Sequence, residues 1–169
     1  MDFIQYTTNW VKGEMFEATI FGSFGLLTII CSLLFWKFGE TPNSKAVIIP
    51  LAIVGLFFLV TAISGIVSNN KRLIEFNEAF QKDRKAFLVS EKKRVEDFQY
   101  LYKTTIIIAA FSFALATCFF LFTDNHILKA IGLALIVFGL TGLIIDYFSK
   151  ERADTYYEVI TTNIKSQFS

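Results

Sequence analysis

Residues 69–103 read NNKRLIEFNEAFQKDRKAFLVSEKKRVEDFQYLYK and form the one long polar segment of the chain. Nine of the sixteen lysines and arginines lie in it: Lys71, Arg72, Lys82, Arg84, Lys85, Lys92, Lys93, Arg94 and Lys103. Two uncharged apolar runs precede this segment and two follow it. With 54% hydrophobic residues and 20 phenylalanines among 169 residues, the chain has more apolar surface than a soluble domain of this size can bury. The sequence therefore predicts an integral membrane protein.

The apolar runs have the length of membrane-spanning helices. The first, residues 18–36, has 19 uncharged residues, and at about 1.5 Å per residue it is roughly as long as the hydrocarbon layer is thick. The other runs cover residues 46–70, 104–123 and 130–145. We therefore expect an all-α integral membrane protein with four transmembrane helices in two hairpins, whose helical cytoplasmic extensions pack as a small bundle. The expected parts are an N-terminal cytoplasmic or interfacial segment (1–17), a first transmembrane hairpin (18–68), a cytoplasmic helical hairpin (69–103), a second transmembrane hairpin (104–148) and a cytoplasmic C-terminal helix (149–169).

The basic residues predict the orientation. If residues 69–103 face the cytoplasm, thirteen lysines and arginines lie on that side and only Lys37, Lys45 and Lys129 lie on the other. Short loops that carry an excess of basic residues remain cytoplasmic. We therefore expect both termini to be cytoplasmic, in a membrane such as the bacterial inner membrane.

The polar segments contain apolar side chains at helical spacing. One seam has Leu73, Phe76, Phe80 and Phe87, a second has Val95, Phe98, Leu101 and Tyr102, and a third has Ala153, Tyr157, Ile160, Ile164 and Phe168. The chain has to reverse between the first two seams, and Ser90 is the expected N-cap of the returning helix. We expect these seams to pack against one another. The alternative is that the helices lie flat on the inner leaflet, with their basic residues on anionic lipid. The expected interaction surface consists of Phe76, Phe80, Phe87, Lys92, Lys93, Arg94 and Tyr157.

The chain offers few groups for catalysis or ligand binding. Membrane transport and catalysis usually require an ionisable residue within a span, and none of the four apolar cores has one. The single histidine, His126, lies in an external turn, and Cys31 and Cys118 lack the C-x-x-C spacing of a redox pair. The two cysteines are expected to be small buried residues. We predict no enzyme activity, no catalytic, cofactor-binding or metal-binding residue and no nucleic-acid partner, whereas a small-molecule ligand is left open.

Acidic residues gather near the cytoplasmic ends of the first and fourth spans. Glu14, Glu17 and Asp146 are expected to form interfacial ion pairs with basic residues nearby, namely Lys71, Arg72, Lys103 or Lys150. The alternative makes Glu17 and Asp146 part of the mouth of an oligomeric cation pore. The hydroxyls of Thr61, Ser64 and Ser68, which recur at helical spacing, would then line that pore. Otherwise these hydroxyls bond their own backbone or a neighbouring helix.

Inert spans and a patterned polar segment favour a non-enzymatic membrane protein that docks a partner, or its own copies, through its cytoplasmic helices. An alternative is an oligomeric pore or membrane effector of a bacterial defence or toxin system, or the matching immunity protein. Residues 149–157, SKERADTYY, resemble the tail of small two-span effectors in such systems. A second alternative is a small solute carrier that uses the acidic residues above. The sequence leaves the partner, the oligomeric state and a possible duplication of the two halves open.

Overall fold

The computed structural model describes residues 3–168, with side chains described as far as Ser166. Its elements are helices: α1 (Phe3–Phe38), α2 (Pro42–Ala46), α3 (Ile48–Lys82), α4 (Arg84–Phe98), α5 (Tyr100–Phe122) and α6 (His126–Phe168). Within the described residues, four helical stretches are long and apolar enough to cross a membrane. The chain is therefore an all-α protein with the composition and helix lengths of an integral membrane protein, as the sequence predicts.

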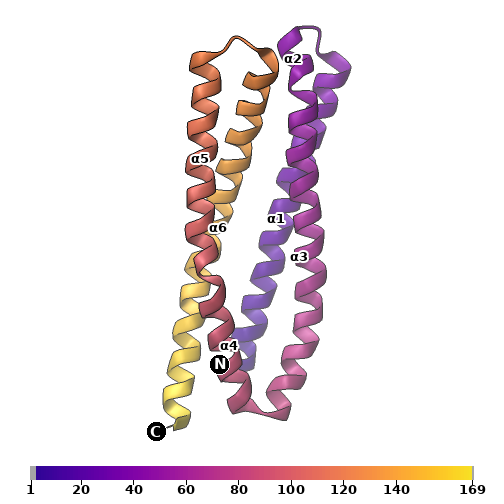
Figure 1. The fold of residues 1–169 in the computed structure, drawn as a ribbon. Helices are drawn as coiled ribbons and strands as arrows, with labels where there is room; N and C mark the ends of the chain where they lie inside the picture. Colours follow the sequence, from indigo (N-terminus) through magenta and orange to yellow (C-terminus); the bar gives the residue numbers. More distant parts are fainter. Residues whose placement is uncertain (1–2, 169) are drawn as a thin grey trace.

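The helices run along one long axis as two side-by-side pairs (Figure 1). Helix α1 packs against α3, and α5 packs against α6. Helix α6 also contacts α1, α3 and α4, so it joins the two pairs. Both termini and the α3–α4 connection lie at one end of the molecule, hereafter the charged end, whereas α2 and the α5–α6 connection lie at the opposite end (Figure 1).

Side-chain caps fix where the chain turns. Asp83 is the N-cap of α4, and its carboxylate accepts a hydrogen bond from Ala86 N at 3.0 Å. Asn125 Oδ1 caps the start of α6 by accepting from Ile127 N at 2.8 Å. The chain therefore reverses at Asp83, and the prediction of Ser90 as the N-cap is wrong. Ser90 lies within α4, where its hydroxyl donates to the Phe87 carbonyl.

Small residues bring the helices of each pair close together. A Cβ atom on Gly25 of α1 would lie 2.8 Å from the carbonyl oxygen of Gly55 on α3, which is closer than side chains approach backbone. In the other pair, Ala109, Ser112 and Ala116 of α5 are buried, and Ala116 lies against Gly132 of α6. Such close approach is how helices associate where no hydrophobic effect drives them together.

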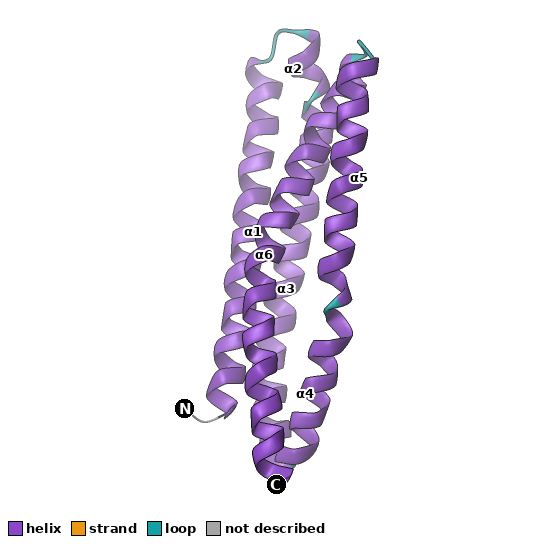
Figure 2. Ribbon diagram, turned by 90° about the vertical axis from the view of Figure 1, so that its left-hand side faces the viewer, coloured by secondary structure: helices purple, strands orange, loops and turns teal. Residues whose placement is uncertain are grey.

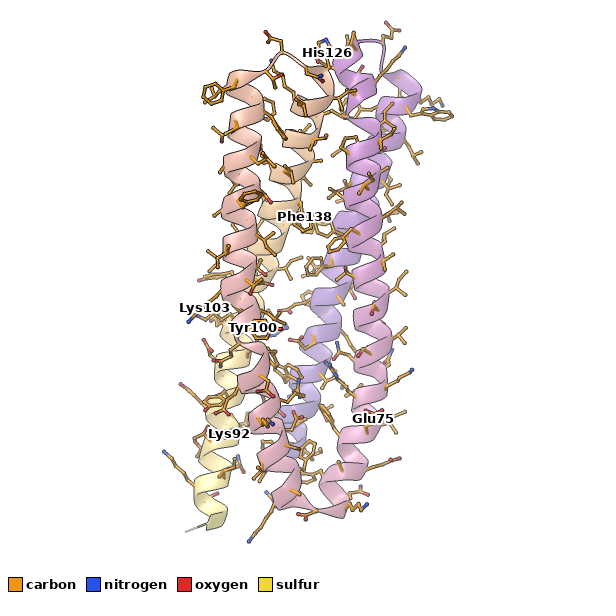
Figure 3. The ribbon with its side chains drawn as sticks, viewed as in Figure 1. Glu75, Lys92, Tyr100, Lys103, His126 and Phe138 are labelled. Atoms are coloured by element: carbon orange, nitrogen blue, oxygen red, sulfur yellow. The ribbon has the colours of Figure 1, made fainter. Side chains whose placement is uncertain are left out.

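The two pairs also touch across the middle of the molecule. The Phe138 ring of α6 extends toward α3 (Figure 3) and stacks on Phe58, with 5.8 Å between the ring centroids. Many other apolar side chains point outward, as expected for helices surrounded by lipid. Cys31 and Cys118 are among the exposed residues, so the expectation that they are buried is wrong. Each cysteine lies on a face of α1 or α5 that no other helix covers.

Continuous helices connect the apolar runs to the charged end. Residues 3–17 do not form a separate interfacial helix, because they belong to the same helix as the first apolar run. They supply a fourth member of the packed helices at the charged end, where the sequence suggested three. The only interruption between α4 and α5 is Gln99, whose amide donates to Glu96 O at 3.3 Å in a tightened turn (Figure 2).

Candidate functional site

The charged end has an aromatic core to which four helices contribute. Within each helix the core residues recur every three or four positions, which places them on one face. Phe3 lies at the centre of this core, with its ring centroid 6.0 Å from Phe80, 6.2 Å from Phe87 and 6.2 Å from Tyr156. The buried members are Phe3, Trp10, Val11, Phe87, Leu88, Val95, Tyr156 and Ile160, and α3 adds the partly buried Leu73, Phe76 and Phe80.

A buried ion pair lies inside this core. The Glu91 side chain is 3% exposed, and both its oxygens accept hydrogen bonds from Arg94, from Nε and Nη2 at 2.8 Å each. The Arg94 guanidinium also lies over the Trp10 ring, with its Cζ atom 4.4 Å from the centroid. A bidentate pair of this kind fixes both side chains in one geometry. The pair lies within α4, and the stacking of Arg94 on Trp10 connects it to α1.

Tyr156 extends the pair into a network across three helices. Its hydroxyl donates to Glu91 Oε2 at 3.0 Å and lies 3.0 Å from the Thr7 hydroxyl, which itself donates to Phe3 O. Burial, reinforced by the negative charge of Glu91, raises the pKa of Tyr156 far above its ordinary value. The hydroxyl therefore stays protonated and acts as a hydrogen-bond donor. This network positions α1, α4 and α6 relative to one another.

A second polar cluster lies where the first apolar run begins. Arg152 Nη2 of α6 lies 2.6 Å from Glu17 Oε1 and 3.4 Å from Glu14 Oε1. Gly13 makes room for this guanidinium, because a Cβ atom there would lie 2.8 Å from Arg152 Cζ. The expected partners of these carboxylates were Lys71, Arg72, Lys103 or Lys150, and that expectation is wrong for Glu14 and Glu17. Their ion-pair partner is Arg152.

One guanidinium faces two carboxylates in this cluster. Both carboxylates lie before the first apolar run, which begins at residue 18. Burial raises the pKa of Glu14, and Arg152 partly offsets that effect. Burial, together with the negative charge of Glu14, raises the pKa of Glu17 to about 7 even though Arg152 is close. Near neutral pH the Glu17 carboxyl is therefore partly protonated, and the cluster carries less negative charge than two fully ionised carboxylates would.

The residues of the expected interaction surface divide into two groups. Phe87 is buried, and Phe76, Phe80, Arg94 and Tyr157 pack against or within the aromatic core. The remaining two are lysines: Lys92 forms an ion pair with Glu96 at 3.3 Å, and Lys93 is exposed. The aromatic members therefore serve the chain's own packing, and the outer face of α4 is what remains open to a partner.

The structure brings together only part of the expected pore set. Thr61, Ser64 and Ser68 are exposed, and the Thr61 hydroxyl donates to its own backbone at Phe57 O. Thr61 and Asp146 do line a common cavity of about 240 Å³ between the two helix pairs. Glu17 does not line this cavity, because it lies against Arg152.

Residues 3–168 contain no assembled metal-binding site and no site built around the histidine. Within that range, no three histidine, cysteine, aspartate or glutamate side chains are grouped as a metal site requires. The His126 ring lies at the end opposite the charged end (Figure 3) and contacts the Asn43 side chain.

Sequence reasoning missed Glu91, Tyr156 and Arg152 of these networks, and it named Arg94 only as part of an interaction surface. Glu91 and Arg94 have the i, i+3 spacing of a helical ion pair, and that spacing is a signal that could have found them. Tyr156 belongs to a seam with Ala153 and Ile160 at spacings of three and four, and it is this tyrosine, not Tyr157, that is fully buried. The spacing of Arg152 and Glu14 carries no such signal, because they are 138 residues apart.

No known protein family, no curated protein and no solved structure matches the chain.

Proposed function

We propose that the chain is a non-enzymatic membrane protein that docks or assembles a protein partner through its cytoplasmic helices. In this proposal the apolar segments cross the membrane as two hairpins, and the charged end lies in the cytoplasm. The distribution of thirteen basic residues against three supports that orientation. The inner membrane of a bacterium is the proposed location.

The aromatic core of the charged end is the observation that carries the proposal. Its members come from α1, α3, α4 and α6, and three of these, α1, α3 and α6, are long helices that run unbroken into apolar segments. A core cross-linked by Glu91, Arg94 and Tyr156 makes a rigid support for whatever lies on its outer surface. A chain that merely filled the bilayer would have no use for such a support.

The outer surface of this support carries apolar side chains among charges. Ile74 of α3 is 65% exposed and Val89 of α4 is 54% exposed, and Lys93 lies one helical turn from Val89. Apolar anchors surrounded by charged groups are the composition of a protein interface. We propose that this surface, and not the buried aromatic residues, contacts the partner.

Site-specific photo-cross-linking tests the docking proposal. A photoreactive amino acid at Val89 is expected to give a protein adduct of one defined mass in living cells, and Lys93→Glu is expected to weaken that adduct. The matched control is Val60, which is equally apolar and 66% exposed but lies in an apolar segment, where lipid is the expected neighbour. Absence of a protein adduct at Val89, Lys93 and Ile74 would contradict docking through this surface.

A second candidate is an oligomeric cation pore, which the shared cavity of Thr61 and Asp146 favours. The purified protein in planar bilayers would then give discrete conductance, and Asp146→Asn would lower its preference for cations. Silence of oligomeric preparations would exclude this candidate. No contact among the described residues favours the immunity-protein or solute-carrier alternatives.

A further inference from the structure

A cavity of about 450 Å³ lies between the two helix pairs at the level where α4 gives way to α5. Tyr100 and Lys103 mark this level (Figure 3). Trp10, Arg72, Asp97, Tyr102 and Asp146 are among the residues that line it. The volume is within the range of roughly 300–1,000 Å³ that is typical of small-ligand sites. The lining combines aromatic rings with charges of both signs.

Three of the lining charges, Arg72, Asp97 and Asp146, form no ion pair within 4.0 Å among the described residues, although Glu14, which also lines the cavity, attracts Arg72 electrostatically from farther away. Arg72 Nη1 donates to the neutral amide oxygen of Asn69 at 3.1 Å, and no described carboxylate lies within 4.0 Å of the Arg72 guanidinium. Asp97 likewise has no described basic group within 4.0 Å. By contrast, Arg94, which lines the same cavity, is paired with Glu91. The cavity thus presents one guanidinium, Arg72, and two carboxylates, Asp97 and Asp146, that are not held in short ion pairs and can contact a ligand with charges of both signs.

One residue of this lining also borders a second cavity, which is apolar. Asp146 lines both the 450 Å³ cavity and the 240 Å³ cavity that extends between the helix pairs. The walls of the second cavity are mainly apolar and include Phe57, Phe138 and Ile108. A charged compartment that adjoins an apolar one has the layout of a site for an amphiphile.

We propose that the two cavities together bind one phospholipid whose headgroup carries both a phosphate and a primary ammonium, with the chemistry of phosphatidylethanolamine. The Arg72 guanidinium is the donor for the phosphate, and Asp97 is the acceptor for the ammonium. One acyl chain enters the apolar cavity.

The headgroup charges explain why other common lipids fit less well. A choline headgroup has the same net charge but no N–H to donate to Asp97. A glycerol headgroup has no positive group at all, so Asp97 would face it unpaired. The proposal rests on the proposed membrane threading, because that threading places residues 100–103 at headgroup depth.

Lipid titration followed by native mass spectrometry tests the proposal on the full chain in mild detergent. The probes are palmitoyl-oleoyl phosphatidylethanolamine, phosphatidylcholine and phosphatidylglycerol. Phosphatidylethanolamine is expected to bind about tenfold more tightly than the other two, as one charge-assisted hydrogen bond predicts. Arg72→Gln is expected to weaken phosphatidylethanolamine and phosphatidylcholine alike by about tenfold. Asp97→Asn is expected to abolish the difference in affinity between phosphatidylethanolamine and phosphatidylcholine.

Matched controls separate the site from general charge effects. Lys71→Gln and Glu75→Gln remove one charge each from exposed positions on α3 outside the cavity, and both are expected to leave the affinities unchanged. Equal affinities for the three lipids, or an unchanged preference in Asp97→Asn, would overturn the proposal. Soluble phosphoethanolamine is expected to compete only at a concentration about a hundredfold higher, because it lacks acyl chains. Competition at equal concentration would assign the cavity to a soluble zwitterion and overturn a lipid ligand.

The lipid test is independent of the docking test. Failure of lipid selectivity leaves the cross-link at Val89 as a prediction of its own. Conversely, absence of that cross-link leaves the lipid affinities unaffected.

Discussion

Substitution of Glu91 by leucine is expected to destabilise the charged end strongly. Three hydrogen bonds end on the Glu91 carboxylate, two from Arg94 and one from Tyr156. Glu91→Leu removes all three acceptor contacts and leaves a cationic side chain beside an apolar core. The carboxylate is almost completely buried, so water cannot take its place as the hydrogen-bond acceptor once it is removed.

The magnitude follows from the burial of the two partners. Removal of one partner from a buried ion pair costs about 3–5 kcal/mol of unfolding free energy. Because the Arg94 side chain is 25% exposed and can regain some hydration, the lower end, about 3 kcal/mol, applies. For a chain of this length that corresponds to a fall in Tm of roughly 6–12 °C. The double variant with Arg94→Leu is expected to recover part of this loss, because it removes the unpaired charge.

Trp10 fluorescence provides the assay. Trp10 lies beneath Arg94 and stacks on Tyr156 with 5.1 Å between ring centroids, so its emission reports on this core. For this measurement the only other tryptophan, Trp36, is replaced by phenylalanine in every variant. The matched control is Glu96→Leu, which breaks the exposed Lys92–Glu96 pair and is expected to change Tm little. If Glu91→Leu costs no more than Glu96→Leu, the polar network does not hold the charged end together.

Three further predictions concern packing, capping and pH. Gly25→Ala is expected to cost about 1–3 kcal/mol of unfolding free energy, because its Cβ meets the backbone of α3. The control Gly142→Ala, whose Cβ meets only Thr105 at 3.5 Å, is expected to be neutral or slightly stabilising in the same thermal unfolding measurement. Equal costs for the two variants would contradict the close α1–α3 approach. Asp83→Ala is expected to cost about 0.5–2 kcal/mol and Ser90→Ala much less, since Asp83 caps α4; the reverse order would contradict the turn at Asp83. The folded-state pKa of Glu17 is raised from 4.5 to about 7, so the folded chain binds the proton of this carboxyl more strongly than the unfolded chain does. The contribution of Glu17 to stability is therefore greatest below about pH 4.5 and is lost as the pH rises through 7. Melting curves across this range should show that fall, relative to Glu17→Gln, and parallel curves for the two proteins would refute it.

The apolar helices could be predicted because the property that defines them is local. An uncharged run of about 19 residues is a helix of membrane length wherever it occurs, and small residues such as Ala109 and Ala116 mark the face that meets a neighbour. These inferences need no knowledge of which helix the neighbour is.

The turn at Asp83 was missed for a physical reason. Phe87 continues the spacing of Leu73, Phe76 and Phe80, so periodicity alone reads the four as one helical face. In the structure the chain reverses at Asp83, and Phe87 packs on Phe76 and Phe80 from the facing helix. A residue that returns to the same core after a turn satisfies the same pattern as one that continues the helix.

The polar contacts of the candidate site could not be predicted because they are tertiary. Arg152 meets Glu14 and Glu17 only after α6 packs against α1, and four other basic residues seemed equally near in sequence. Tyr156 and Tyr157 differ by one position, which is about 100° around a helix. That rotation decides which tyrosine joins Glu91 and which bonds the exposed Glu96.

Cysteine accessibility tests most directly whether the charged end lies in the cytoplasm. With Cys31 and Cys118 replaced by alanine, one single cysteine is introduced as Glu40→Cys, in the exposed loop before α2, and another as Glu78→Cys, at an exposed position near the end of α3. A membrane-impermeant maleimide applied to intact spheroplasts should label position 40 at once and position 78 only after permeabilisation. Labelling of position 78 from outside, or of both positions from the same side, would contradict four crossings with a cytoplasmic charged end.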